Sequence, residues 1–393
     1  MLSYGFDRRT RITMDTDWTA YSLDSGAVRA GHSAEPVTDC RRAFALMLAR
    51  IARAKKYVLL ETYNFADDVV GRIFAAALTR KAGEGVPVFV IYDAAGSLDT
   101  KTDFFDGLRR AGVAVGEYHP LEPLHSIRNF FRRNHRKMLV VDGREAFVGG
   151  MNITAEFAHR EEGGQSWKDC VAHFDGPCID DITILFWESW RRCRRTARPV
   201  ACEPWGGPVT GGVLAQAVSV SGTRNRRSIR RGYWHAIEKA SESIYITNAY
   251  FLPGIGTIRR LTRAAKRGVD VRLIMPSVTD HPYVRWAAWS IFPKLLRSGI
   301  KIYEWQGTVL HAKTAVVDGM WSTVGSHNLD HRSLYYNLEL NLNLLGEEFG
   351  SKMKAAFEDD LKNCRPVSLE DCRGKGALFN MAGRLLYWLR FLL

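Results

Sequence analysis

The chain has 393 residues, enough for two domains of ordinary size, and its charge is strongly basic. Its 55 lysines and arginines exceed its 42 acidic residues by 13, which predicts a polyanionic partner, either nucleic acid or an anionic membrane surface. The seven cysteines form no Cys-x-x-Cys pair, which disfavours zinc ribbons and disulfide frameworks and indicates a reducing compartment. The sequence shows neither a signal-peptide core nor an apolar run of about 18 residues, so we expect no transmembrane helix.

The first predicted elements alternate between helix and strand. Residues 43–63, AFALMLARIARAKKYVLLETY, predict an amphipathic helix that runs into a strand, and FAAALTRKAGEGVPVFVIYD predicts a second such pair. Next comes NHRKMLVVDGREAFVGGMN, residues 134–152, in which His135 and Lys137 leave the same face of a strand. A basic strand end exposed to water would look the same, so this stretch alone does not indicate a site.

The second half of the chain repeats this order. Residues 230–250 resemble residues 43–63, and IRRLTRAAKRGVDVRLIMP predicts another helix and strand. HAKTAVVDGMWSTVGSHN then follows at 311–328. At an offset of 176 positions, five residues recur without a gap, namely His135, Lys137, Asp142, Gly149 and Asn152 as His311, Lys313, Asp318, Gly325 and Asn328. Such a coincidence indicates a duplicated unit.

The repeat predicts an α/β fold of two similar sandwich halves related by a pseudo-two-fold axis. A Pro- and Gly-rich stretch at 195–212 separates the halves. We expect an N-terminal extension at 1–36, a first half at 37–200, a second half at 201–365 and an amphipathic tail at 366–393. The axis would bring both His-x-Lys pairs into one shared cleft.

Two histidines and two lysines in one cleft suit a tetrahedral anion, above all a phosphodiester. The lysines would hold the non-bridging oxygens and stabilise the transition state. One neutral imidazole could attack phosphorus, while the other, protonated, gives its proton to the leaving oxygen.

Other residues of the repeat could support this chemistry. Asp142 and Asp318 could each orient an imidazole, as carboxylates do in catalytic triads. Asn152 and Asn328 could donate hydrogen bonds to phosphate oxygens. No set of metal ligands accompanies these residues, so we expect a site without metal or other cofactor.

The two His-x-Lys-x4-Asp patterns, each followed by Gly and Asn, resemble the duplicated signature of the phospholipase D superfamily. The likeness covers nearly the whole chain. Outside the motifs, the chain most resembles bacterial cardiolipin synthases of the short type, which lack N-terminal transmembrane spans. It is carried by LLETYNFADDVVG, FRRNHRKMLVVDGREAFVGGMNITAE, GVDVRLIMP and LHAKTAVVDGMWSTVGSHNLDHRSLYYNLELN.

This resemblance implies roles for several residues. His135 would be the nucleophile that becomes phosphohistidine, and His311 the general acid and then the general base. Glu61, Asp169 and Glu339 match the acidic residues that the family places near its motif histidines. The implied activity is phosphatidyl transfer that makes cardiolipin from phosphatidylglycerol and a second phospholipid. Hydrolysis to phosphatidic acid is the nearest alternative, and a nuclease is a more distant one.

The sequence also departs from the family pattern. Gly150 stands where many relatives carry serine, whereas the second motif keeps Ser326, a candidate phosphate contact. Asn248 occupies the position in the second half that Glu61 holds in the first, so the two half-sites are not equivalent.

Aromatic and basic residues occur together in three segments. The tail, KGALFNMAGRLLYWLRFLL, carries Arg384, Trp388 and Arg390 and predicts an interfacial anchor, or a helix packed on the protein's own core. HPYVRWAAWSIFPKLLRSG carries Trp286, Trp289 and Phe292, which suit a membrane interface, base stacking or a core helix.

The third segment, SIRNFFRRN at 126–134, could line the mouth of the cleft. Together with the resemblance, the three segments favour anionic phospholipids and a membrane surface over nucleic acid as partners. We therefore expect a peripheral protein on the cytoplasmic side of the cell membrane.

Overall fold

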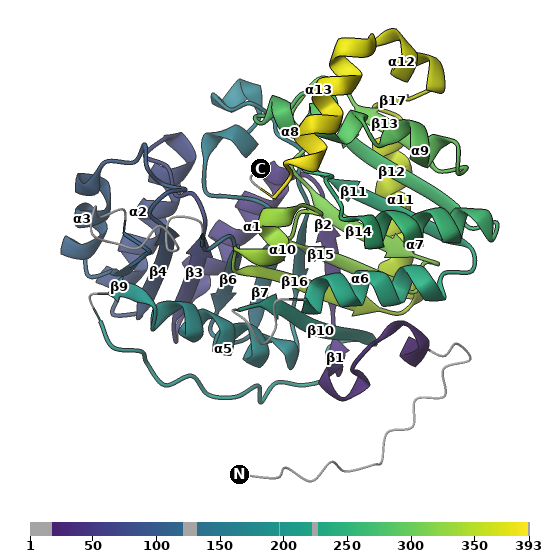
Figure 1. Ribbon diagram of the computed structural model, residues 1–393. Coiled ribbons are helices and arrows are strands. Elements are labelled where there is room, and N and C mark those ends of the chain that lie inside the picture. Colours follow the sequence, from purple (N-terminus) through teal and green to yellow (C-terminus); the bar gives the residue numbers. More distant parts are fainter. Residues whose placement is uncertain (1–17, 121–131, 196, 222–226, 392–393) are drawn as a thin grey trace.

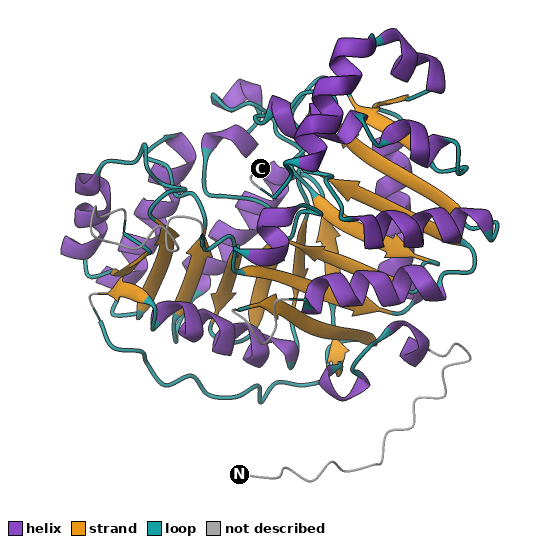
Figure 2. Ribbon diagram, viewed as in Figure 1, coloured by secondary structure: helices purple, strands orange, loops and turns teal. Residues whose placement is uncertain are grey.

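The computed structural model describes residues 18–120, 132–195, 197–221 and 227–391 (Figure 1). Its strands form two large mixed sheets, one from each half of the chain, with helices packed against them (Figure 2). Residues 126–131 of the predicted segment at the cleft mouth lie outside the described residues.

In the described part of the chain, the first sheet has eight strands. In spatial order they are β2 (Ala34–Val37), β8 (Val171–Phe174), β7 (Glu145–Gly149), β6 (Met138–Val141), β3 (Val58–Thr62), β4 (Val88–Asp93), β5 (Ala114–Tyr118) and β9 (Cys193–Arg195). The strands β3, β4 and β5 run parallel. They are connected through α2 (Val69–Gly83) and α3 (Thr102–Arg110), as parallel neighbours require.

Among the described residues, the second sheet has nine strands, and most of them follow the order of the first sheet. Their order is β1 (Arg29–His32), β10 (Val213–Val220), β16 (Glu339–Leu345), β15 (Trp321–Gly325), β14 (Lys313–Val317), β11 (Ser243–Asn248), β12 (Asp270–Pro276), β13 (Lys301–Trp305) and β17 (Cys364–Pro366). The series β8-β7-β6-β3-β4-β5-β9 corresponds strand by strand to β16-β15-β14-β11-β12-β13-β17. This correspondence confirms the predicted duplicated α/β fold.

The buried residues form three clusters. One lies between the two sheets, together with α5 (Cys178–Trp190) and α11 (Glu347–Leu361). The second lies between the second sheet and the helices α6 (Ser228–Lys239) and α7 (Ile255–Lys266), and the third between the first sheet, α1 (Cys40–Arg53) and α2. Both faces of the central strands are therefore covered, which explains why their sequences are continuous apolar runs.

The N-terminal strands connect the two halves. β1 pairs with β10 of the second sheet, whereas β2, which begins two residues after β1 ends, pairs with β8 of the first sheet. The described part of the predicted N-terminal extension thus adds an edge strand to each sheet, and the boundary predicted at residue 36 falls inside β2.

The second half of the chain also contains several short helices. They include α8 (Pro282–Trp289), α9 (Phe292–Leu296), α10 (His331–Tyr335), α12 (Leu369–Gly374) and α13 (Ala377–Trp388). α13 packs against α8, and both lie at the top of Figure 1. No helix in the described part of the chain is both long enough and apolar enough to cross a membrane.

Candidate active site

The two motif histidines lie just before equivalent strands of different sheets. His135 is three residues before β6, and His311 is two residues before β14. Both imidazoles line a single cavity of about 220 Å³, to which both halves contribute residues. The structure therefore brings together the two histidines that the repeat relates.

Each imidazole is hydrogen bonded to a buried carboxylate from the opposite half. The Nδ1 atom of His135 lies 3.0 Å from Oε2 of Glu339, and Nδ1 of His311 lies 2.8 Å from Oδ2 of Asp169. Both carboxylates are fully buried. A carboxylate at Nδ1 favours the tautomer that carries its proton there, which leaves the lone pair of Nε2 for a substrate.

Backbone contacts between the halves hold these pairs in place. The backbone N–H of His135 donates to the carbonyl oxygen of Leu338 (2.9 Å), next to Glu339 in the chain. The backbone N–H of His311 donates to the carbonyl oxygen of Lys168 (2.7 Å), next to Asp169. In each half-site, the segment that carries the histidine is therefore bonded to a segment of the opposite half that carries the carboxylate.

Burial lowers the pKa of both imidazoles. For His135 burial acts together with the charges of Lys137 and Lys313, and the pKa falls well below its usual 6.5. For His311 burial and Lys313 also lower the pKa, but the hydrogen bond to Asp169 opposes the shift. These shifts favour the neutral form of both rings near pH 7, and a bound anion would raise both pKa values.

The lysines lie beside the histidines. The Nζ atom of Lys137 donates to the carbonyl oxygen of His135 (2.8 Å), and Nζ of Lys313 donates to that of His311. Burial lowers the pKa of Lys137 well below its usual value and that of Lys313 to about 8. An ammonium group has three N–H bonds, so each lysine keeps donors for a phosphate oxygen.

A tyrosine accompanies each His-x-Lys pair, which the sequence reasoning missed. The ring of Tyr63 lies 5.2 Å from that of His135 and the same distance from Nζ of Lys137. Tyr250 lies 6.3 Å from the His311 ring and 5.9 Å from Nζ of Lys313. A signal was present, because these tyrosines end the two repeated stretches 43–63 and 230–250.

The residues shared by the two copies of the repeat also include two asparagines, and both line the cavity. The side-chain oxygen of Asn152 accepts a hydrogen bond from the backbone of Asn64 (3.4 Å). That of Asn328 is buried and has no partner among the described residues. Their role as phosphate ligands remains a prediction.

The prediction that Asp142 and Asp318 orient the imidazoles is wrong. Asp142 follows β6 and accepts backbone hydrogen bonds from Lys55, Lys56 and Tyr57. Asp318 follows β14 and accepts equivalent bonds from residues 241–243. Each aspartate therefore lies at the end of β6 or β14 that is far from the histidine. Asp142 anchors the turn between α1 and β3, and Asp318 anchors the turn between α6 and β11.

Ser326 does not face the cavity. Its hydroxyl group is fully buried and donates to the carboxylate of Glu339, so it supports that carboxylate and is not a direct phosphate contact. In the first half the equivalent position is Gly150, where an added Cβ would lie 2.5 Å from an oxygen of Asp169. The second motif therefore has a serine that donates to Glu339, whereas the first has a glycine because Asp169 leaves no room for a side chain there.

Glu61 supports the site from behind. Its buried carboxylate accepts a hydrogen bond from the side chain of Asn134 (2.6 Å), the residue before His135. Burial raises its pKa. Asn248, in the equivalent strand, accepts from the backbone of Leu329 instead. Glu61 thus bonds to the side chain just before the first motif histidine, whereas Asn248 bonds to the backbone just after Asn328 of the second motif.

The predicted membrane residues divide into two groups. Trp289 and Phe292 are 1% exposed and belong to the core, so their assignment to a membrane interface is wrong. Trp286 is 44% exposed and Trp388 is 67% exposed. Arg384 is exposed as well.

Arg390 is half-buried against the ring of Tyr387, with its guanidinium carbon 4.6 Å from the ring centre.

In the described part of the chain, no group of three His, Cys, Asp or Glu side chains is arranged to hold a metal ion. A site without metal therefore remains a prediction.

Comparison with known proteins identifies the family. Residues 47–165 and 233–361, which include both histidine motifs, match the family model described as cardiolipin synthase, PLD-like domain. The chain belongs to this family. The cardiolipin synthase of Clostridium perfringens (strain SM101 / Type A) is 32% identical to it over 338 residues, which are 84% of this chain and 71% of that protein.

Other relatives in the family cover more of the chain. The major cardiolipin synthase of Bacillus subtilis (strain 168) is 31% identical over 375 residues, 93% of this chain and 77% of that protein. Among solved structures, a phosphatidylserine synthase from Haemophilus influenzae has a similar fold. It has a TM-score of 0.71 at 13% identity, with coverage of 92% of this chain and 95% of that one.

Proposed function

We propose that this protein is a phosphatidyltransferase that makes cardiolipin from phosphatidylglycerol and a second phospholipid. The observation that carries the proposal is the pair of imidazoles in one cavity, each hydrogen bonded through Nδ1 to a buried carboxylate of the opposite half. The names of the two sequence relatives reported above, both cardiolipin synthases, supply the lipid class.

In the first step, Nε2 of His135 attacks the phosphorus of the donor lipid. The bond from phosphorus to the leaving alcohol breaks, and His311 gives its proton to that oxygen. The charge of the phosphate, together with Asp169, raises the pKa of His311, so that this ring is protonated when substrate is bound. Lys137 and Lys313 stabilise the negative charge on the non-bridging oxygens.

In the second step, a primary hydroxyl group of phosphatidylglycerol replaces the departed alcohol. The neutral His311 takes the proton of this hydroxyl group while its oxygen attacks phosphorus, and the bond to His135 breaks. Water could react in the same way and would yield phosphatidic acid. A lipid-filled cavity that excludes water favours the lipid alcohol.

The exposed face of α13 fits a membrane surface beside this cavity. Four large apolar side chains recur at spacings of three and four residues and are 56–79% exposed, namely Leu378, Met381, Leu385 and Trp388. The opposite face packs on α8, whose residues Tyr283 and Val284 line the catalytic cavity. We therefore place the membrane on the side where α13 lies.

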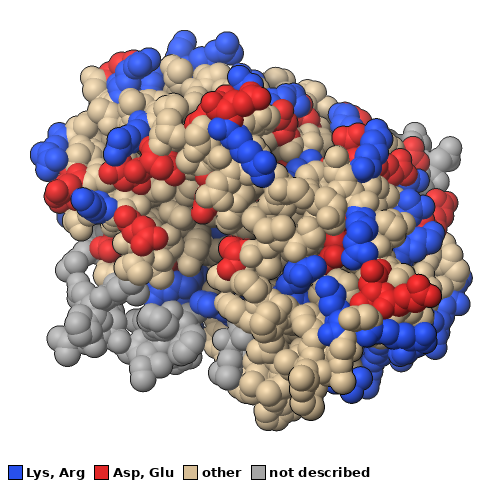
Figure 3. All heavy atoms as spheres, turned by 90° about the horizontal axis from the view of Figure 1, so that it is seen from above, with Lys and Arg blue, Asp and Glu red and all other residues tan. Residues whose placement is uncertain are grey.

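The distribution of charge supports this placement. Figure 3 looks onto the side that is uppermost in Figure 1 and shows an uncharged projection at its lower edge, with many Lys and Arg side chains and a smaller group of Asp and Glu side chains to its right. An apolar face beside basic residues suits a bilayer with anionic headgroups. The membrane so engaged would be the inner leaflet of the cell membrane.

The test is to incubate the purified protein with acyl-labelled phosphatidylglycerol in mixed micelles and EDTA, and to identify the products by mass spectrometry. Cardiolipin and glycerol would support the transferase. Phosphatidic acid alone would show a phospholipase D, and a lack of lipid products would direct attention to nucleic-acid phosphodiesters. Strict dependence on added divalent metal would contradict the metal-free mechanism.

A further inference from the structure

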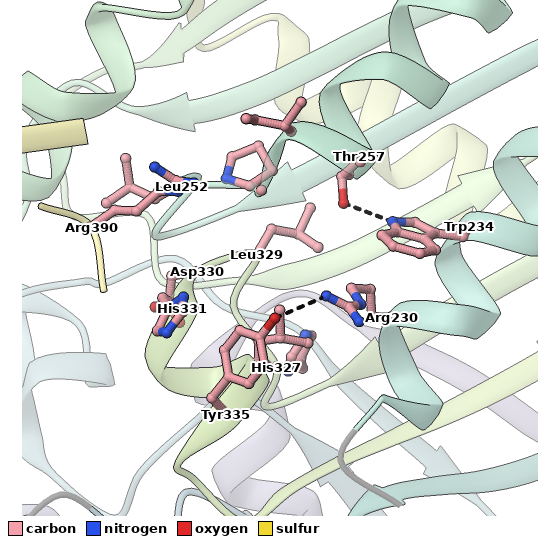
Figure 4. A pocket seen from close by; sticks show the side chains of 15 residues that line it. Arg230, Trp234, Leu252, Thr257, His327, Leu329, Asp330, His331, Tyr335 and Arg390 are labelled. Carbon is pink, nitrogen blue, oxygen red and sulfur yellow. Dashed lines mark hydrogen bonds between the residues drawn. The ribbon is translucent and has the colours of Figure 1, made fainter. Parts of the chain in front are cut away.

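A second cavity, of about 270 Å³, lies beside the catalytic one in the second half (Figure 4). It contains neither motif histidine. Residues 327–331 separate the two cavities, because Asn328 lines the catalytic cavity, His327 and Leu329 line the second one, and Asp330 lines both. A ligand in the second cavity would therefore contact the segment that carries a predicted phosphate ligand of the active site.

Two arginines from distant parts of the chain line this cavity, and Figure 4 shows them on opposite sides. The guanidinium carbon of Arg230 lies 4.5 Å from the ring centre of Trp234, and Nη1 lies 3.4 Å from the hydroxyl oxygen of Tyr335. Its Nε atom is buried without a partner. Arg390 donates from Nη1 to the carbonyl oxygen of Tyr387 (2.8 Å).

Among the described residues, no carboxylate forms an ion pair with Arg230 or Arg390. Two uncompensated guanidinium groups in a partly enclosed site favour an anion, and guanidinium groups match phosphate geometry well.

A buried imidazole adds a third polar group. His327 is 2% exposed, and its Nδ1 atom has no hydrogen-bond partner in the part of the chain that the structure describes. Burial lowers its pKa to about 4, so the ring is neutral. An unsatisfied buried ring nitrogen is costly, and a ligand or water that bonded to it would remove this cost.

Among the described residues, Asp330 is the one acidic side chain on the cavity wall. Its carboxylate caps α10 by accepting a hydrogen bond from the backbone of Ser333 (2.7 Å). Burial raises its pKa to about 6, and a bound anion would raise it further, towards the neutral form. Asp330 therefore opposes an anion less than an exposed aspartate would.

Several apolar side chains complete the wall and connect it to the proposed membrane face. Leu252, Ile255, Leu329 and Leu334 line the cavity, and Ile255 is 50% exposed at its edge. The hydroxyl group of Tyr387, in α13, donates to the carbonyl oxygen of Pro253 (2.8 Å), which also lines the cavity. The cavity thus combines cationic groups with an apolar wall and lies next to the helix that we place on the membrane.

We propose that the second cavity binds an anionic phospholipid, with its phosphate between Arg230 and Arg390 and its glycerol and first acyl carbons against Leu252 and Ile255. This accessory site goes beyond the transfer reaction, because no reacting group lies in it. Lipid bound there would stabilise the segment 327–331 and so the position of Asn328 in the catalytic cavity.

The test uses the full-length His135→Ala protein, which cannot turn over its ligand, and dihexanoyl phosphatidylglycerol below its micelle-forming concentration. Isothermal titration calorimetry should show two binding events, one for each cavity. Arg230→Gln should remove one event or weaken it at least tenfold. Arg231→Gln is the matched control, since Arg231 is the next residue of α6, is exposed and does not line the cavity.

A second variant guards against misfolding of Arg230→Gln. Ile255→Asn changes a half-exposed side chain at the apolar edge and should weaken the same event at least threefold, with an unchanged melting temperature. Two intact events in Arg230→Gln, or equal losses in Arg231→Gln, would overturn the proposal. So would inorganic phosphate that displaces the lipid from this site at an equal concentration, which would indicate a site for free phosphate. Because binding is measured without turnover, failure of the proposed transferase activity would be seen separately.

Discussion

The Nδ1 atom of His135 and the carboxylate of Glu339 lie 3.0 Å apart, although 204 residues separate them in the chain. His311 and Asp169 form the corresponding pair with the halves exchanged. Neither half therefore contains a complete imidazole–carboxylate pair, and the catalytic unit that we propose exists only when the two sheets pack together.

Replacing either carboxylate should reduce turnover without unfolding the protein. Glu339→Gln removes the charge that stabilises the His135 tautomer, and we expect kcat to fall by about 10²- to 10⁴-fold, as for a triad carboxylate. Cardiolipin formation at saturating lipid measures this effect. Glu348→Gln, which alters an exposed ion pair with Lys352, is the control. A kcat for Glu339→Gln within threefold of the unmodified protein would show that the pair does not support catalysis.

The two turn aspartates should affect stability more than chemistry. Asp142 has a φ of 57° and accepts several backbone hydrogen bonds, and asparagine tolerates this backbone conformation. We expect Asp142→Asn to lower the free energy of unfolding by about 1–3 kcal/mol, because charged hydrogen bonds are lost. Urea denaturation measures the change. A large loss of kcat with unchanged stability would restore the catalytic role that the sequence suggested.

The pH dependence should report on His311. This ring must be protonated to act as an acid, and its pKa in the free protein lies below 6.5. The value of kcat/KM, which reports on the free enzyme, should therefore decline as the pH rises through that pKa. Asp169→Asn removes a contact that raises the pKa, so the decline should begin at lower pH. An identical decline in both proteins would assign it to another group.

The apolar face of α13 should determine binding to vesicles. Leu378→Glu combined with Leu385→Glu changes side chains that are 79% and 56% exposed, so the fold should remain intact. We expect at least tenfold weaker co-sedimentation with phosphatidylglycerol vesicles and unchanged turnover of short-chain soluble lipid. Lys352→Glu, on the exposed surface of α11, is the control. Normal vesicle binding by the double variant would place the membrane on another face.

The internal repeat was sufficient to predict the fold and the meeting of the two histidines. The two motifs match position by position at one offset of 176 residues, which implies equivalent positions in two like sheets, and a pseudo-two-fold arrangement brings equivalent positions together. The resemblance to the phospholipase D superfamily, and not the repeat, indicated Asp169 and Glu339 as acidic residues near the site. The repeat could not show the exchange between halves, since no local pattern records which half supplies a partner.

The errors have physical explanations. A strand rises about 3.3 Å per residue, so the five residues from Lys137 to Asp142 span about 17 Å, and the aspartate cannot reach the imidazole. Trp289 and Phe292 pack with their helices on the second core cluster, and aromatic character alone does not distinguish a core residue from an interfacial one. Ser326 was wrongly predicted to contact phosphate because its hydrogen-bond partner, Glu339, lies 13 residues later on a neighbouring strand, where the motif itself gives no sign of it.

The central claim is that the two imidazoles share one phosphoryl site, with His135 as the nucleophile. Rapid quenching of the protein during turnover of phosphatidylglycerol, followed by alkaline digestion and mass spectrometry, tests it most directly. We predict a phosphatidyl group on the peptide that contains His135, and its absence in His135→Ala together with loss of turnover. A phosphatidyl group on His311, or near-normal turnover by His135→Ala, would contradict the account.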